Sequence, residues 1–298
     1  MILTDRPRLG ICLRILSGFL GAGMYISVKA VSDDVPLGEI VFFRSFFAII
    51  PLVVFLWIRG EFPSGLATKR PFEHFLRASF GALALFTSFA ALSRLNLSEA
   101  ILLAQLTPIL TAMAAVVLLS ERLTVFRVGG LGLGFTGVVM LVLPELGGGN
   151  VNSTRLTGIA LGLVAAVLSA LALITVRKLS SSESPGAIAL YFVLASMLAA
   201  LLTIPWGWAV PNGEVLLYLV AAGGFGGFAH IAMTLSFRYA EASRLAPFEY
   251  IALMWPLLAD LFIFRLPIAT TFLIAAPLVL AGAALAATEG AKRRSDQN

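Results

Sequence analysis

Residues 244–256 read Arg244-Leu-Ala-Pro-Phe-Glu-Tyr-Ile-Ala-Leu-Met-Trp-Pro256, and the apolar segment that they begin continues to about Arg265. A segment of this length can cross the hydrocarbon core of a bilayer, which needs about 20 apolar residues. Glu249 nevertheless places a carboxylate inside it. Because ionisable groups in membrane segments are costly, they usually face a bundle interior or a watery cavity and serve a function. The segment therefore predicts a membrane helix that lines a substrate site.

The composition of the whole chain indicates a membrane protein. Of 298 residues, 59% are apolar and only 12% are charged, and the mean hydropathy is +0.96. Soluble domains carry about 25% charged residues, so a large soluble domain is excluded. The pI near 9.7 does not indicate a nucleic-acid partner, because no soluble domain remains to carry a basic face. Cys12 is the only cysteine, which excludes an intramolecular disulfide and a cysteine metal site, and we expect no metal or cofactor.

Hydropathy predicts ten transmembrane helices joined by short connections. They are expected at residues 10–31, 37–58, 72–93, 97–119, 126–144, 156–178, 186–206, 214–237, 244–265 and 268–288. Lys and Arg, Arg77 among them, concentrate at the loops on the side of the N-terminus, and such loops face the cytoplasm. We therefore expect an all-α polytopic protein of the bacterial inner (plasma) membrane, with both termini cytoplasmic.

An internal duplication is indicated by matching positions in the two halves. Lys29 and Lys178 each lie seven residues before a proline, Pro36 or Pro185, where the first and the sixth predicted helices end. The predicted repeats are residues 1–149 and 150–298. Five helices per repeat is an odd number, so the repeats would be inverted in the membrane, as in many secondary transporters. Such a chain can function as a monomer.

A set of residues along the chain matches the pattern of a known family. They are Lys29, Phe43-Arg44, Pro108 followed by Leu119-Ser-Glu-Arg-Leu-Thr124, and Ala246-Pro-Phe-Glu-Tyr250 with Trp255. In this order the chain resembles the EamA branch of the drug/metabolite transporter superfamily, and it is most similar to the YddG-type exporters. The resemblance implies ten helices as a five-plus-five inverted repeat and export of aromatic and other neutral amino acids. One departure is Phe264-Arg-Leu-Pro267, where the family's second repeat often has a glutamate.

Other functions are weighed against the same residues. A carrier of another metabolite or of a cationic drug is an alternative, because the Glu249 carboxylate would suit a cationic substrate. An anionic nucleotide is not favoured as a substrate, because it would need converging Lys or Arg side chains, which the predicted midplane does not show. A passive pore is less favoured, since no charge ring or carbonyl filter motif occurs. An enzyme is not expected, because His-Glu-x-x-His is absent and Asp260 is the only intramembrane aspartate.

The strongest site candidates lie on the eighth and ninth predicted helices. Glu249 would attract a substrate ammonium group or carry a coupling proton, or else pair structurally with a neighbouring helix. Tyr250 and Trp255 would stack against an apolar part of the substrate. His230 shares a helix face with Gly223, Gly226, Gly227 and Thr234 and would exchange a proton, bind a carboxylate or contact Glu249.

The remaining candidates come mainly from the first half of the chain. Gln105 and Thr107 lie just before Pro108 and offer polar groups without fixed charge, while Thr87 and Ser88 are similar. Arg44 is deep enough in its helix to line an outer vestibule and bind a carboxylate, and Tyr25 would contribute an aromatic wall. Pro108 and Pro256 are expected to be hinges for alternating access. No catalytic residue is expected.

Overall fold

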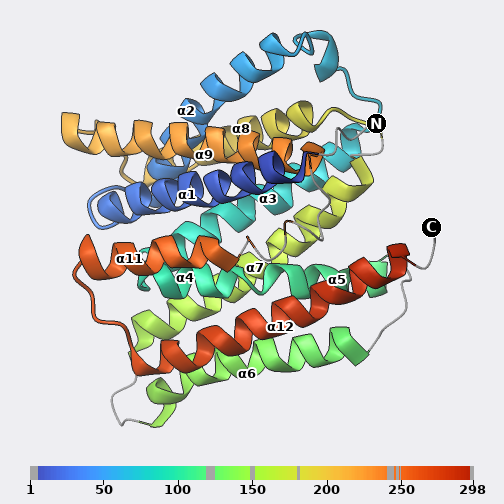
Figure 1. Cartoon of the computed structure of the whole chain (residues 1–298). Helices are drawn as coiled ribbons and strands as arrows, with labels where there is room; N and C mark the ends of the chain where they lie inside the picture. The colour runs from blue at the N-terminus through green and yellow to red at the C-terminus, as the bar shows by residue number, and fades with distance from the viewer. Residues whose placement is uncertain are drawn as a thin grey trace.

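The computed structural model describes residues 6–118, 125–147, 152–179, 182–239, 245, 248 and 250–295. These residues form a bundle of α-helices, most of which run roughly along one direction (Figure 1), and none of them lies in a β-strand. The helices are α1 (Pro7–Val31), α2 (Leu37–Ile58), α3 (Pro71–Leu92), α4 (Leu97–Ala104), α5 (Thr107–Leu118), α6 (Val125–Gly147), α7 (Ser153–Leu179), α8 (Pro185–Leu201), α9 (Gly213–Tyr239), α11 (Met254–Phe262) and α12 (Thr270–Ser295).

The predicted all-α membrane class is confirmed. In the described part of the chain, five helices are long and apolar enough to cross a membrane by length and composition, namely α1, α2, α3, α7 and α9. Shorter apolar helices occupy four of the other predicted spans, namely 97–119, 126–144, 186–206 and 268–288. The beginning of α1 and the end of α12 lie on the same side of the bundle (Figure 1, right). That this side is cytoplasmic stays a prediction.

Two predicted helices are interrupted next to a proline. The span predicted at 97–119 divides into α4, which ends at Ala104, and α5, which begins at Thr107. Pro108 accounts for the break, because it has no N–H to donate and its ring crowds the carbonyl four residues earlier. In the span predicted at 244–265, a 3-10 turn (Tyr250–Leu253) precedes α11, which contains Pro256. Helices broken in this way leave backbone groups free to line a cavity.

The helices of the two sequence halves are interleaved. The most extensive contacts join α1 to α9, α6 to α12, α3 to α7, α2 to α9 and α2 to α8, so each contact links one half to the other. If the predicted repeats are exchanged, the α1–α9 contact becomes the α7–α3 contact and the α2–α9 contact becomes the α8–α3 contact, while the α2–α8 and α6–α12 contacts stay the same. This is the pattern that an inverted repeat predicts, although the repeat itself stays a prediction.

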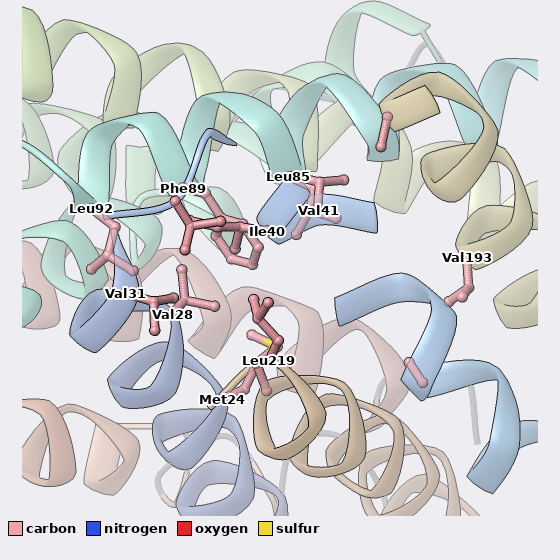
Figure 2. Close-up of a cluster of buried hydrophobic side chains, with 14 of the residues drawn as sticks. Met24, Val28, Val31, Ile40, Val41, Leu85, Phe89, Leu92, Val193 and Leu219 are labelled. Atoms are coloured by element: carbon pink, nitrogen blue, oxygen red, sulfur yellow. The ribbon is translucent and has the colours of Figure 1, made fainter. Parts of the chain in front are cut away.

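Buried apolar side chains gather in two clusters. Figure 2 shows part of the first, in which Met24, Val28 and Phe89 of α1 and α3 meet residues of α2, α8 and α9. The second cluster includes Leu103 and Val279 and joins α4 and α5 to α6, α7 and α12. Side chains from both clusters line one internal cavity, which therefore lies between them.

Glycine permits the close approach of α6 and α12. A Cβ atom at Gly282 would lie 2.5 Å from the carbonyl oxygen of Gly130 and 2.8 Å from the backbone nitrogen of Gly134. Both obstacles are backbone atoms, so they cannot rotate away. A side chain at this position would have to push the two helices apart.

Gly282→Ala is therefore expected to destabilise the protein by about 1–3 kcal/mol, the usual cost of overpacking. The control is Gly132→Ala on α6, where a Cβ atom would meet nothing within 4 Å. In that variant the higher helix propensity of alanine should leave stability unchanged or slightly raised. Thermal unfolding in detergent measures both, and equal melting temperatures would contradict the packing argument.

Candidate functional site

An internal cavity of about 400 Å³ lies among α1, α2, α3, α4, α5, α7, α8 and α9. Most of its wall is made of glycine, alanine and larger apolar side chains. The polar or ionisable residues that line it are Ser17, Tyr25, Arg44, Arg77, Ser88, Thr107, Ser169 and His230. Pockets of about 300–1,000 Å³ with a few polar groups in an apolar wall are typical of small-molecule sites.

Arg44 enters the cavity from α2 and is one of the most deeply buried charged residues that the structure describes. Only 2% of its surface is exposed, and it lies about 10 Å along α2 from Leu37, at 1.5 Å per residue. Its Nη2 contacts Met24 Sδ at 3.5 Å, whereas its Nε and Nη1 are buried without a hydrogen-bond partner. A Cβ atom at Gly226 would lie 3.2 Å from Nη2, so this glycine makes room for the guanidinium.

Arg77 enters the same cavity from α3, about 9 Å from the beginning of that helix. Its guanidinium carbon lies 4.5 Å from the centre of the Phe192 ring, an arrangement that favours a cation. Its Nε and Nη1 are also buried without a hydrogen-bond partner. A Cβ atom at Gly81, one turn further along α3, would collide with Nη1, so the side chain lies over this glycine.

Arg77 was not predicted as a site residue and was counted with the cytoplasmic charges. The structure instead places it in the lining of the same cavity as Arg44. Two signals were available in the sequence. Arg77 lies well inside a predicted helix, and Gly81 follows it by one turn on the same face.

His230 lines the cavity from α9, as expected for a substrate contact. Its ring lies 6.4 Å from the Phe192 ring, centre to centre, and both arginine charges act on it electrostatically. The glycine face that was predicted around it packs closely, since a Cβ atom at Gly223 would lie 2.9 Å from the carbonyl oxygen of Arg44. This face therefore serves both predicted purposes: it packs against α2 and opens onto the cavity.

Four other predicted residues, Tyr25, Ser88, Thr107 and the hinge candidate Pro108, lie at or beside the cavity. Tyr25, Ser88 and Thr107 line it, and the Tyr25 ring also packs edge-on against Phe89 at 6.1 Å. Thr107 begins α5, directly after the helix break and before Pro108. The break thus brings the Thr107 hydroxyl group to the cavity wall.

Three predicted residues do not line this cavity. The Thr87 hydroxyl donates to the carbonyl oxygen of Leu83, in its own helix, at 2.8 Å. Gln105 ends α4, where its backbone N–H closes the last turn. Trp255 packs edge-on against Phe19 at 5.2 Å. Glu249 and the side chain of Tyr250 lie outside the described residues, so the predicted contact of Glu249 with His230 stays a prediction.

Charge is distributed unevenly around the cavity. Two arginines and a histidine line it, and no Asp or Glu does so among the residues that the structure describes. In the same part of the chain, no group of three or more His, Cys, Asp or Glu is placed to hold a metal ion. The described wall therefore favours an anionic group such as a carboxylate.

The corner between α3 and α4, residues 92–98, lies at one end of the cavity. Side chains from both halves of the chain form hydrogen bonds with its backbone. From α11, buried Asp260 accepts hydrogen bonds from the backbone N–H groups of Leu97 at 3.0 Å and Ser98 at 2.7 Å. From α1, Lys29 Nζ donates to the carbonyl oxygens of Leu92 at 2.9 Å and Leu95 at 3.0 Å. Asp260 caps the beginning of α4, and Lys29 caps the end of α3.

A polar surface pocket lies on the outer side of this corner. Its volume is about 530 Å³, and Arg94, Glu99 and Arg155 are among its lining residues. Arg155 Nη2 lies 2.6 Å from Glu99 Oε1, which neutralises both charges. Its ion pair compensates Glu99 and Arg155 within the protein, unlike the arginines of the internal cavity.

At the end of α3 that is farther from the α3–α4 corner, the loop before α8 contacts the loop before α3. Glu183 Oε1 accepts hydrogen bonds from the Thr68 hydroxyl at 3.0 Å and from the backbone N–H of Lys69 at 3.1 Å. His74 Nε2 lies 3.6 Å from Glu183 Oε2. Burial alone would raise the pKa of Glu183, but these three neighbours together lower it.

A carboxyl group whose pKa is lowered by folding stabilises the protein at pH values above its unfolded pKa, and this contribution disappears as the pH falls. Glu183 should therefore stabilise the contact above about pH 4.5 and lose its effect on further acidification. We expect the melting temperature of the wild type to fall more steeply below this pH than that of Glu183→Gln. Parallel curves for the two proteins would contradict this assignment.

Comparison with known proteins supports the same class of molecule. Residues 8–143 match the model of the EamA-like transporter family. The pseudopaline exporter CntI of Pseudomonas aeruginosa is 28% identical over 258 residues, which cover 85% of this chain and 87% of that protein. The S-adenosylmethionine uptake transporter of Rickettsia prowazekii is 26% identical over 256 residues (86% and 84%), and the riboflavin transporter of Rhizobium johnstonii is 28% identical over 251 residues (82% and 79%).

A crystal structure with 22% sequence identity superposes with a TM-score of 0.64 and covers 92% of this chain and 96% of its own, so the two share a fold. The resemblance to the EamA family is confirmed, and the narrower similarity to YddG-type exporters stays a prediction. The family match and the apolar helices also confirm the predicted location in the bacterial inner membrane.

Proposed function

Because residues 8–143 carry an EamA-like transporter domain, we propose that this chain is a secondary transporter whose substrate is a small carboxylate-bearing metabolite, with amino acids as the first class to test. The observation that carries this proposal is the buried guanidinium of Arg44, which faces the cavity with two of its nitrogens unpaired. A substrate carboxylate is the group that would satisfy them.

The electrostatic reason is the cost of a buried charge. A guanidinium removed from water is destabilising unless an anion or hydrogen-bond acceptors compensate it. No described acidic residue lines the cavity, so a bound carboxylate would supply the compensation and form two parallel hydrogen bonds with Arg44. Tyr25, His230 and the hydroxyl groups of the wall would then contact the rest of the molecule.

The named relatives support the class of substrate but not its identity. Their names specify pseudopaline, S-adenosylmethionine and riboflavin, and they include both exporters and uptake transporters. All three substrates are small metabolites, so we propose the same for this chain. Outward transport, and amino acids as substrates, come from the similarity to the YddG-type exporters.

For the mechanism we propose alternating access. The interleaved contacts of the two sequence halves would let one set of helices rock against the other, and the breaks beside Pro108 and Pro256 would supply the bending points. Opening one end of the cavity would require the Asp260 and Lys29 contacts at the α3–α4 corner to break. Opening the other end would require the Glu183 contact to break.

The test is counterflow of labelled amino acids into proteoliposomes, with and without a pH gradient. Saturable uptake and exchange against internal substrate are expected of a carrier, whereas flux that rises linearly with concentration would indicate a pore. Three compounds separate the substrate classes: phenylalanine, 3-phenylpropionate without the ammonium group, and phenethylamine without the carboxylate.

We expect 3-phenylpropionate to compete and phenethylamine not to compete. The opposite result would favour the alternative of a cationic drug. If no carboxylate on the amino-acid panel exchanges, the proposed function fails. Glu249→Gln should be compared in the same assay, because equal transport by both proteins would remove Glu249 from substrate binding and proton coupling.

A further inference from the structure

The two arginines of the cavity lack the acidic partner that Arg155, a partly buried arginine, has. Arg155 has a carboxylate partner, Glu99, at 2.6 Å. Arg44 and Arg77 have no acidic partner in the described part of the chain, and each keeps two buried nitrogens without a hydrogen bond. A single substrate carboxylate at Arg44 would leave Arg77 without an anionic partner.

Each arginine is accommodated by the residues that surround it. Arg44 lies against Gly226 and Met24, while Arg77 lies between Gly81 and the face of Phe192. A side chain on either glycine would crowd the guanidinium that lies over it. The packing therefore holds both cations at defined positions in the cavity wall and does not direct either of them to an internal anion.

The positions of the two cations suit a ligand with two separate anionic groups. Arg44 lies seven residues from the beginning of α2, and Arg77 lies six residues from the beginning of α3, the next helix along the chain. Because consecutive membrane helices run in opposite directions, the two side chains start near opposite ends of the cavity. His230 lies one turn from Gly226 on α9 and 6.4 Å from the Phe192 ring, so it links the two positions.

We propose that the transported molecule carries two carboxylates, as a dicarboxylate or an acidic amino acid does, with one carboxylate at Arg44 and the other at Arg77. His230 lies beside the chain that joins the two groups and can donate a hydrogen bond to either of them. This inference rests on the proposed function, because it names the substrate class of the same cavity. It replaces the neutral amino acids expected from the sequence with acidic ones.

The test compares ligands of nearly equal shape that differ by one negative charge. The pairs are glutamate with glutamine and succinate with succinamate, at matched ionic strength. In competition against counterflow, we expect glutamate and succinate, which have two carboxylates, each to bind at least about tenfold more tightly than its amide, which corresponds to about 1.4 kcal/mol. We also expect these two compounds to raise the melting temperature of the purified protein more than the amides do.

Arg77→Gln should remove this preference while transport of the amides continues, and Arg94→Gln is the matched control. Arg94 is an exposed arginine near the other end of α3 that donates to its own helix at the carbonyl of Ala90, so its replacement should keep the preference. Equal or tighter binding of the amides by the wild type would overturn the inference but leave the proposed function standing. If neither member of either pair competes while another amino acid such as phenylalanine exchanges, the inference fails and the proposed function stands; if no carboxylate exchanges at all, both fail. A preference for glutamate and succinate over their amides that survives Arg77→Gln would also overturn the inference.

Discussion

Replacement of Arg44 by methionine is expected to weaken the apparent affinity for a carboxylate substrate by about 100-fold, equivalent to about 3 kcal/mol. The loss would come from the charge-assisted hydrogen bonds that Arg44 offers in a wall where it is only 2% exposed. Folding should persist, because methionine fills apolar space beside Met24 and removes a buried charge that has no internal partner. The half-saturation concentration for counterflow in proteoliposomes measures the effect.

Two variants make this result interpretable. Arg44→Lys keeps the charge but loses the planar fork of donors, so it should recover only part of the affinity. Arg94→Met removes an exposed arginine of the surface pocket and should leave the affinity unchanged. Wild-type affinity in Arg44→Met would show that Arg44 does not anchor the substrate.

Replacement of Asp260 by alanine is expected to destabilise the protein by about 3 kcal/mol, since hydrogen bonds to a charged acceptor contribute about 1.5–3 kcal/mol each. The backbone N–H groups of Leu97 and Ser98 would lose their acceptor at a site where Asp260 is only 1% exposed. Lys29 would also lose the nearby negative charge that acts on it. A fall of several degrees in the melting temperature is the expected measurement.

The controls separate capping from loss of charge. Asp260→Asn keeps one carbonyl acceptor, so its melting temperature should lie between those of the wild type and of Asp260→Ala. Asp34→Ala removes an exposed carboxylate from the turn after α1 and should change stability by less than about 0.5 kcal/mol. Similar melting temperatures for Asp260→Ala and the wild type would contradict the capping role.

The helices could be predicted from the sequence because the bilayer imposes both length and apolar character on each crossing. The predicted span 37–58 coincides with α2, and the span at 72–93 differs from α3 by one residue at each end. Pro108 was predicted to be a hinge from its chemistry alone, and it lies beside the break between α4 and α5. These features depend on local sequence, so they can be predicted without a structure.

The composition of the cavity could be predicted only in part. Arg44 and His230 were found because each is a polar residue deep in an apolar segment. Arg77 was not, because counting charges near helix ends cannot distinguish a side chain that reaches the lipid headgroups from one that turns inward over Gly81. Asp260 was predicted to be an intramembrane aspartate, but its partners are backbone N–H groups of α4, which no side-chain pattern reveals.

The two arginines also matter when the cavity is empty. Fixed positive charges in a water-poor passage raise the energy of any cation that enters, as an arginine does in water channels that exclude protons. Moving one charge across a potential of 100 mV releases about 2.3 kcal/mol, so an open passage would dissipate the gradients of the cell. Arg44 and Arg77 would therefore make the unloaded transporter resistant to sodium and proton leak at the moment when one gate has opened and no substrate is present.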